Sequence, residues 1–231
     1  MHLKINRDFV QNEISQKGYV VIEDVLSDQE CHQLIFNFDA TQLYRKTVNM
    51  ERYRFGAGTY RYFKYPLPDI IERLREMVYP ELVPIANQWM SKLKLDLVYP
   101  KDLGKLHQLC VDHGQHLATP LILKYQKGGF NTLHQDLYGE VYFPMQAVLF
   151  LNDYGADYSG GEFVLTQQVP RAQSKAMVLH PKKGSMLIFC TNFRPVQGKN
   201  GFYRVTMKHG VSEVHSGERY TLGIIFHDAA Q

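Results

Sequence analysis

A histidine and an aspartate two residues apart are the first candidates for chemistry in this chain. His134 and Asp136 flank Gln135, and His209 follows far downstream. In an extended strand, side chains two apart project from the same face, so the imidazole and the carboxylate can reach one point in space. A second imidazole, from His209, would complete a 2-His-1-carboxylate set. That set suits six-coordinate Fe(II) and leaves positions open for a bidentate cosubstrate and O2. The three residues therefore predict a catalytic iron site.

Arg219 and Thr221 are candidates for an anion site beside that metal. Arg219 begins a largely apolar run, and a charged side chain drawn into apolar surroundings needs a partner. A 2-oxo diacid that chelates iron through one end must have its far carboxylate held. A guanidinium does this with two parallel charge-assisted hydrogen bonds. Thr221 faces the same side of the strand and can add a hydroxyl hydrogen bond.

Structural roles compete with these functional ones. A lone histidine beside a strand is more often a hydrogen-bonded structural residue than a ligand, and Arg219 could be an ordinary ion-pair residue. His180, His215 and His227 have no carboxylate at the triad spacing, so we assign them structural roles.

A second cluster of metal-binding residue types could suggest zinc. It consists of His107, Cys110, Asp112, His113 and His116. Structural zinc sites usually combine two paired ligand motifs at regular spacing, and this cluster has no such pair. The segment is expected to be a loop that leads into the first barrel strand.

Several short motifs follow one another through the C-terminal half. They are His134-Gln135-Asp136, Ser159-Gly160-Gly161-Glu162-Phe163, Lys183-Gly184-Ser185-Met186-Leu187-Ile188-Phe189, His209-Gly210-Val211 and Gly217-Glu218-Arg219-Tyr220. In this order they resemble the double-stranded β-helix of Fe(II)/2-oxoglutarate dioxygenases. The resemblance covers residues 120 to 228 firmly and residues 5 to 120 loosely. It implies Fe(II) as the metal, with 2-oxoglutarate and O2 as cosubstrates.

The same resemblance also implies a role for Tyr125. The stretch Tyr125-Gln126-Lys127-Gly128 before the His-x-Asp motif resembles one shared by AlkB-type dealkylases and prolyl-hydroxylase-like enzymes, which implies that Tyr125 hydrogen-bonds 2-oxoglutarate. Six residues after Arg219 the AlkB type has a second arginine, whereas this chain has Ile225. The motif at His209 is closer to the prolyl-hydroxylase type. The whole chain resembles a bacterial family of 2-oxoglutarate oxygenases assigned to oxidative dealkylation of damaged nucleic acid.

The resemblance implies that 2-oxoglutarate is oxidatively decarboxylated to succinate and CO2 while the substrate is hydroxylated. On an N-methyl base the product would lose formaldehyde, and on a carbon centre it would be a stable alcohol. Three classes of function therefore stay open. They are a nucleic-acid dealkylase, a protein (prolyl-type) or small-molecule hydroxylase, and a jelly-roll binding module without activity, which an intact triad disfavours.

The segment between Tyr44 and Tyr65 favours a nucleic-acid substrate. It carries six cations and the single acid Glu51, interleaved with seven aromatic rings. Cations can neutralise phosphates while rings stack on unpaired bases. The alternative is a hairpin of two alternating strands, residues 52–55 and 60–65, around a turn at Gly56-Ala57-Gly58, with the rings inward and the charges solvated. Both can hold if the hairpin forms a lip over the iron.

Composition agrees with one enzyme domain. The 231 residues are 45% apolar and 13% aromatic, enough for a sizeable core, so we expect a single domain over residues 1–231. Three widely spaced cysteines argue against a disulfide framework and for a reducing compartment, so we expect a cytoplasmic protein. No apolar run is long enough to span a bilayer, and no membrane partner is expected. The net charge of +3 permits a nucleic-acid partner without requiring one.

The elements expected to position these residues divide the chain in two. The helical part, about 1–120, has predicted helices at 6–17, 27–40 and 68–90 and a strand at 18–22, with a capping box at Ser27 and a break or kink at Pro80 and Pro84. The jelly-roll core, about 121–228, has eight predicted strands. They span 121–126, 133–138, 142–151, 162–168, 176–180, 185–190, 204–209 and 219–226. The expected fold class is α+β with a mainly β core.

Overall fold

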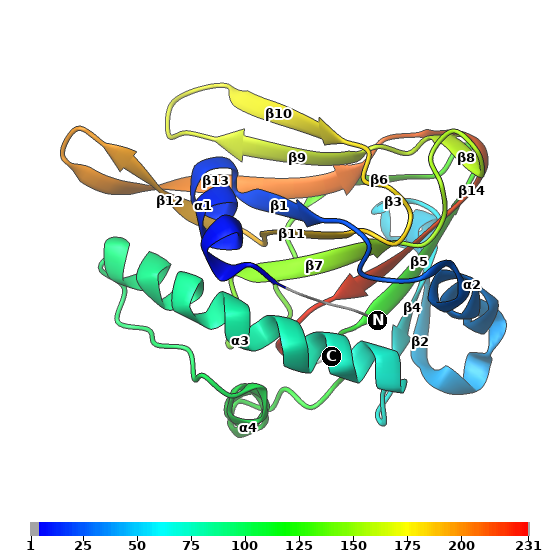
Figure 1. Ribbon diagram of the computed structural model, residues 1–231, viewed down its shortest axis with the longest axis horizontal. Helices are drawn as coiled ribbons and strands as arrows, with labels where there is room; N and C mark the ends of the chain where they lie inside the picture. The colour runs from blue at the N-terminus through cyan, green and yellow to red at the C-terminus, as the bar shows by residue number, and fades with distance from the viewer. Residues whose placement is uncertain (1–4, 231) are drawn as a thin grey trace.

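Two antiparallel sheets face each other, and the helices pack mainly against the larger one (Figure 1). The computed structural model describes residues 5–230. The eight-stranded sheet has the order β1-β11-β7-β14-β5-β4-β2, with β8 paired to β14. Its strands are β1 (Tyr19–Ile22), β2 (Tyr44–Asn49), β4 (Thr59–Phe63), β5 (Leu121–Gln126), β7 (Met145–Phe150), β8 (Tyr158–Gly160), β11 (Met186–Cys190) and β14 (Val214–Ile224).

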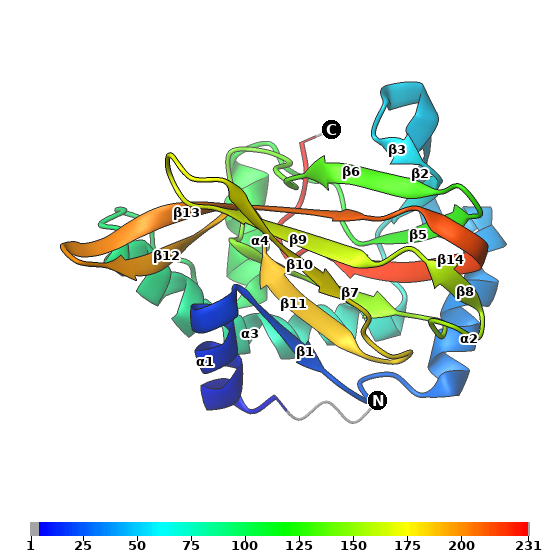
Figure 2. The same cartoon turned by 90° about the horizontal axis from the view of Figure 1, so that it is seen from above.

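The six-stranded sheet has the order β10-β9-β13-β6-β3, with β12 paired to β13. Its strands are β3 (Gly56–Ala57), β6 (Phe130–His134), β9 (Phe163–Gln168), β10 (Ser174–Leu179), β12 (Phe193–Gly198) and β13 (Gly201–Val211). Figure 2 shows this sheet lying over the larger one. Two facing sheets over one core confirm the predicted jelly-roll class.

Within residues 5–230, four α-helices precede or flank the barrel. They are α1 (Arg7–Lys17), α2 (Asp28–Phe36), α3 (Asp69–Lys92) and α4 (Leu103–Asp112), and short 3-10 turns occur at Asn37–Asp39, Thr41–Leu43 and Met50–Tyr53. The predicted capping box begins α2, since Ser27 accepts from the Glu30 amide and Glu30 accepts from the Ser27 amide. No helix within residues 5–230 is long and apolar enough to cross a membrane.

The long helix α3 covers the outer face of the eight-stranded sheet (Figure 1). Leu74, Val78 and Trp89 on its inner side are almost fully buried and belong to the same apolar core as strand residues of that sheet. Of the break or kink predicted at Pro80 and Pro84, a break does not occur, because α3 runs through both. The two prolines lie four residues apart on the exposed face, where the carbonyls they leave unpaired can bond water, and burial of the opposite face outweighs the lost hydrogen bonds.

Other boundaries also differ from the predictions. The hairpin expected at 52–55 and 60–65 is wrong, since β4 pairs with β2 and the turn before β3 is a 3-10 turn capped by Asn49. The loop expected at the His107 cluster is wrong for residues up to Asp112, which form α4 and bury Leu106 and Cys110, whereas His113 and His116 lie beyond the helix. The predicted strand 133–138 ends at His134 as β6, so Asp136 lies in the loop beyond it. Four strands of the two sheets have no counterpart among the predicted strands: β2, β3, β8 and β12.

Candidate metal centre

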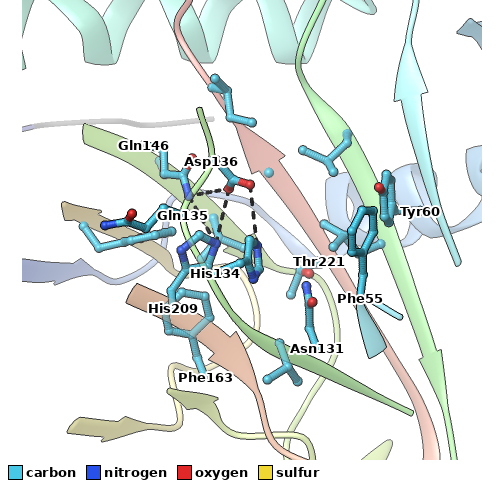
Figure 3. Close-up of a pocket in the computed structure, with 18 of the residues that line it drawn as sticks. Phe55, Tyr60, Asn131, His134, Gln135, Asp136, Gln146, Phe163, His209 and Thr221 are labelled. Atoms are coloured by element: carbon cyan, nitrogen blue, oxygen red, sulfur yellow. Dashed lines mark hydrogen bonds and ion pairs between the residues drawn. The ribbon is translucent and has the colours of Figure 1, made fainter. Parts of the chain in front are cut away.

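His134, Asp136 and His209 converge between the two sheets, as the spacing predicted. Their ligand atoms all lie within 4.8 Å of one another, and this is the one such cluster found among residues 5–230. His134 ends β6 and is the cross-strand partner of His209 on β13, so sheet pairing brings the two imidazoles together. Asp136 Oδ1 is 3.5 Å from His134 Nε2, and Oδ2 is 3.2 Å from His209 Nε2 (Figure 3).

The surroundings of the two imidazole rings fix how they are oriented. His134 Nδ1 lies 2.7 Å from the Thr132 carbonyl, which fixes the ring and leaves Nε2 free for a metal. His209 is nearly fully buried between the rings of Phe163 and Phe189, and its Nδ1 has no hydrogen-bond partner among the described residues. Two imidazoles and a carboxylate on one side of a cavity are a donor set that fits Fe(II).

Two side chains that sequence reasoning missed hold the Asp136 carboxylate. The Tyr138 hydroxyl donates to Oδ1 at 2.8 Å, and Gln146 Nε2 donates to Oδ2 at 2.8 Å (Figure 3 draws the latter). Tyr62 donates in turn to the Tyr138 hydroxyl at 3.2 Å. The spacing of Tyr138, two residues after Asp136, could have indicated its position. Gln146, on β7, had no local signal.

Electrostatics favours an ionised aspartate in this cluster. Burial by itself would raise the pKa of the Asp136 carboxyl, but the charge on His209 and hydrogen bonds from both imidazoles hold that pKa well below its usual range. Burial and the neighbouring His134 lower the pKa of His209. The lowered pKa of Asp136 favours the carboxylate, which is the form of this side chain that binds a metal.

Arg219 lies on the facing sheet, buried to 1% exposure. Its register partner on β5 is Tyr125, and its guanidinium lies 5.5 Å from the ring centres of Tyr125 and Phe150. Nη1 is 3.5 Å from the Thr221 hydroxyl, while Nε and Nη2 have no hydrogen-bond partner among residues 5–230. A buried guanidinium with no carboxylate beside it is a site prepared for an anion.

Gly161 explains why a glycine pair precedes β9. It has φ +64°, and a Cβ atom there would lie 2.9 Å from Arg219 Cδ and 2.8 Å from Val214 Cγ2. A larger residue would therefore push against the arginine that this turn covers. The Ser-Gly-Gly-Glu-Phe motif thus lies against one side of the Arg219 side chain.

Tyr125 is fully buried, and its hydroxyl accepts a hydrogen bond from Asn131 Nδ2 at 3.3 Å. Burial raises the pKa of the phenol to about 12, so the hydroxyl stays protonated and can donate. Tyr125 and Thr221 flank the Arg219 guanidinium and line the same cavity.

One cavity of about 260 Å³ contains both halves of the site. The three triad residues, Arg219, Thr221 and Tyr125 all line it, together with the rings of Phe55, Tyr60, Tyr62 and Tyr138. Figure 3 shows Phe55 and Tyr60 side by side, across the cavity from the triad. Ile225, which stands where the AlkB type has its second arginine, is an apolar part of the same wall.

The remaining candidates lie elsewhere and have structural contacts. His107 Nε2 lies 2.9 Å from Arg75 Nη2 and 3.0 Å from the Phe226 carbonyl, so it belongs to a buried network and not to a zinc site. His227 Nδ1 accepts from the Phe143 amide at 3.1 Å. His180 packs edge to face on Tyr154.

Facing antiparallel sheets with a 2-His-1-carboxylate cluster between them define the class of jelly-roll oxygenases. The family model Oxygenase-NA, described as "Oxygenase, catalysing oxidative methylation of damaged DNA", matches residues 58–229. The chain belongs to this family, and it is an oxygenase. Two uncharacterized proteins of Mycobacterium tuberculosis, from strains CDC 1551 / Oshkosh and ATCC 25618 / H37Rv, are each 45% identical over 191 residues, which is 80% of this chain and 82% of each relative.

Solved structures share the fold at low sequence identity. A prolyl hydroxylase from Trichoplax adhaerens aligns with TM-score 0.60 and 16% identity, over 95% of this chain and 87% of that one. A Pseudomonas putida prolyl-4-hydroxylase aligns with TM-score 0.56 and 14% identity, over 94% and 96%. A 2OG-Fe(II) oxygenase from Burkholderia pseudomallei aligns with TM-score 0.56 and 15% identity, over 100% and 96%. The predicted oxygenase family, jelly-roll fold class and oxygenase activity are therefore confirmed.

Proposed function

We propose that this oxygenase uses Fe(II) and 2-oxoglutarate to remove N-alkyl groups oxidatively from bases of single-stranded nucleic acid. His134, Asp136 and His209 hold the metal and form the catalytic centre. Arg219, with Thr221 and Tyr125, binds the far carboxylate of 2-oxoglutarate. The observation that carries the proposal is the placement of Arg219, buried and without an anionic partner, in the same cavity as the triad.

The cosubstrate assignment rests on charge and shape. A buried cation with two unpaired N–H donors calls for an anion, and the metal positions call for a chelating group. One molecule with a 2-oxo acid at one end and a carboxylate at the other satisfies both. Tyr125 and Thr221 each offer the carboxylate one hydroxyl beside the guanidinium.

When bound, iron activates O2 at the expense of 2-oxoglutarate, which becomes succinate and CO2, and the second oxygen atom enters a substrate C–H bond. On an N-methyl group this gives N–CH2OH, which breaks at the C–N bond to release formaldehyde and return the N–H. The protein's own part is to hold the reactants and exclude water. Tyr138 and Gln146 orient Asp136, and the Phe55 and Tyr60 rings offer apolar faces to a planar base.

The substrate class is supported by the family description, which concerns damaged DNA, and by exposed cations and rings at the cavity mouth. An alternative is hydroxylation of a protein or small molecule, in agreement with the His-Gly-Val motif and with apolar Ile225 in place of a second arginine. The products separate the two, because dealkylation releases formaldehyde and carbon hydroxylation does not.

The test is succinate and formaldehyde release by Fe(II)-loaded protein with 2-oxoglutarate and methylated or unmethylated single-stranded oligonucleotides. Formaldehyde that requires the methyl group supports the proposal, with His134→Ala as the inactive control. Succinate without formaldehyde, equal with and without oligonucleotide, would leave an oxygenase with another substrate. Full turnover by both His134→Ala and Asp136→Ala would contradict the metal site itself.

We also propose that residues 1–231 form one catalytic domain in the cytoplasm. One apolar core joins α1, α3 and strands of both sheets, which supports the single domain. Cys31, Cys110 and Cys190 are buried and free, as suits a reducing compartment.

A further inference from the structure

Two exposed aromatic rings stand at the mouth of the cavity, on the segment before β3. Tyr53 and Phe55 are 55% and 47% exposed, and their rings stack with centres 5.5 Å apart and planes 19° apart. Phe55 also lines the cavity, so the stacked pair is continuous with the site. What sets this pair apart from other exposed rings is that the two rings stack on each other and adjoin the cavity.

The backbone of this segment is held in place. Asn49 caps the 3-10 turn through the Glu51 amide, and the Phe55 amide donates to the carbonyl of buried Met50 at 3.2 Å. Thr132 on β6 then bonds the Phe55 carbonyl twice, through its amide at 2.9 Å and its hydroxyl at 2.8 Å. Figure 2 shows the segment projecting beyond the sheets beside β3 and β6. The rings are therefore presented outward by a fixed turn.

Cations alternate with the rings along the same turn. Arg52 and Arg54 flank Tyr53, both are exposed, and neither makes an ion pair or side-chain hydrogen bond with any residue in 5–230. Glu51 is the one acid between residues 44 and 65. Exposed arginines beside exposed rings match the chemistry of single-stranded nucleic acid, whose phosphates alternate with bases that can stack.

Two other cations of the same stretch have internal roles. Arg45 donates to the Ala118 carbonyl and lies over the Tyr62 ring, and Arg61 lies over the Phe38 ring and donates to its carbonyl. These contacts hold the paired strands β2 and β4 against neighbouring segments at Phe38 and Ala118. Of the four cations in this stretch that are exposed, Arg52 and Arg54 lie at the turn beside the cavity, and Lys46 and Lys64 lie outside it.

We propose that residues 51–55 form a docking platform for the nucleotides that flank the target base, with Tyr53 stacking on a neighbouring base and Arg52 and Arg54 contacting phosphates. The proposal rests on the proposed function and names how that site engages its substrate. The proposal assigns binding of the nucleic acid to a surface outside the metal centre. A platform variant should therefore lose strand affinity while the chemistry at the metal continues.

The test measures binding and turnover separately. Binding is the fluorescence anisotropy of a labelled unmethylated single-stranded oligonucleotide with Mn(II)-loaded protein and 2-oxoglutarate, over a series of NaCl concentrations. The variants are Arg52→Gln with Arg54→Gln, and Tyr53→Leu. The matched control is Arg171→Gln with Lys175→Gln, two exposed cations in the β9–β10 turn and at the start of β10, neither of which lines the cavity. Turnover is succinate release with an N-methylated nucleoside, which has no phosphate.

The double arginine variant should lower the slope of log affinity against log salt by about 1.4, since each phosphate contact on a single strand contributes about 0.7. Tyr53→Leu should weaken binding roughly tenfold, the cost of one lost base stack. The control pair should bind like the wild type, and all variants should release succinate from the nucleoside at the wild-type rate.

Wild-type affinity and salt slope in both platform variants would overturn the platform. So would a wild type that does not bind the strand while still releasing succinate, which leaves the oxygenase proposal standing. If the wild type bound the oligonucleotide but released no succinate, and the platform variants lost that binding, the platform would stand and the proposed function would be rejected.

Discussion

Replacing Arg219 with methionine should remove 2-oxoglutarate binding without unfolding the protein. The arginine is 1% exposed and its Nε and Nη2 have no partner among the described residues, so the fold gains little from its charge. Methionine fills similar volume and keeps contact with the Tyr125 and Phe150 rings. What is lost is the pair of charge-assisted bonds to the cosubstrate carboxylate. Truncating one partner of such a buried pair costs about 3 kcal/mol, or roughly a 150-fold rise in Kd.

The assay is chemical unfolding of Mn(II)-loaded protein with and without 2-oxoglutarate. At 100 times the wild-type Kd, 2-oxoglutarate should stabilise the wild type by about 2.7 kcal/mol. With Kd raised roughly 150-fold, the same concentration should stabilise Arg219→Met by only about 0.3 kcal/mol. Thr221→Val, which loses one hydroxyl hydrogen bond worth about 1 kcal/mol, should retain about 1.8 kcal/mol.

Lys124→Met is the matched control, because Lys124 lies one register position away on β5 and pairs with Glu218 at 2.8 Å, outside the cavity. It should keep the full ligand stabilisation. Equal stabilisation of wild type and Arg219→Met by 2-oxoglutarate would refute the reasoning. Loss of Mn(II) affinity with unchanged 2-oxoglutarate affinity would assign Arg219 to the metal instead.

Three further predictions concern the metal, pH and stability. Tyr138→Phe removes a hydrogen bond to Asp136 and should lower Mn(II) affinity roughly tenfold, measured by titration calorimetry; unchanged affinity would deny it an orienting role. Burial lowers the pKa of His227 from 6.5 to about 3. Between these two pH values the unfolded chain binds more protons than the folded one, so the free energy of unfolding falls as the pH decreases. Measured by urea unfolding, the free energy of unfolding of the wild type should fall by about 2 kcal/mol more than that of His227→Asn between pH 7 and pH 5. An equal fall in the two proteins would contradict this. Ser27→Ala breaks the capping box with Glu30 and should cost about 1 kcal/mol, seen as a lower urea midpoint at unchanged slope.

Local periodicity explains what could be predicted from the sequence. The two-residue repeat of a strand predicted that His134 and Asp136 share one side of the chain; β6 ends at His134, and Asp136 reaches the same point from the loop beyond it. Arg219 and Thr221 share a strand face for the same reason. Capping chemistry located the start of α2 within one residue.

Packing overruled local signals in two places. Pro80 and Pro84 indicate a helix break, yet the buried face of α3 keeps the helix continuous. Alternation at 52–55 indicates a strand, yet β4 pairs with β2 instead because that pairing buries Tyr44 and Phe63 against the core. Sequence patterns report propensity, and burial against distant elements decides when propensities compete.

The sequence by itself determined the chemistry of this protein: which side chains can bind a metal, which can hold a dicarboxylate, and in what order they occur. Only the tertiary structure decided that they lie around one cavity. His134 meets His209, and Arg219 meets Tyr125, through pairing of strands far apart in the chain. Gln146 on β7 reaches Asp136 through a side-chain hydrogen bond across the space between the sheets. Contacts of this kind depend on register and sheet packing, which are set by burial over the whole domain and have no local periodicity to reveal them.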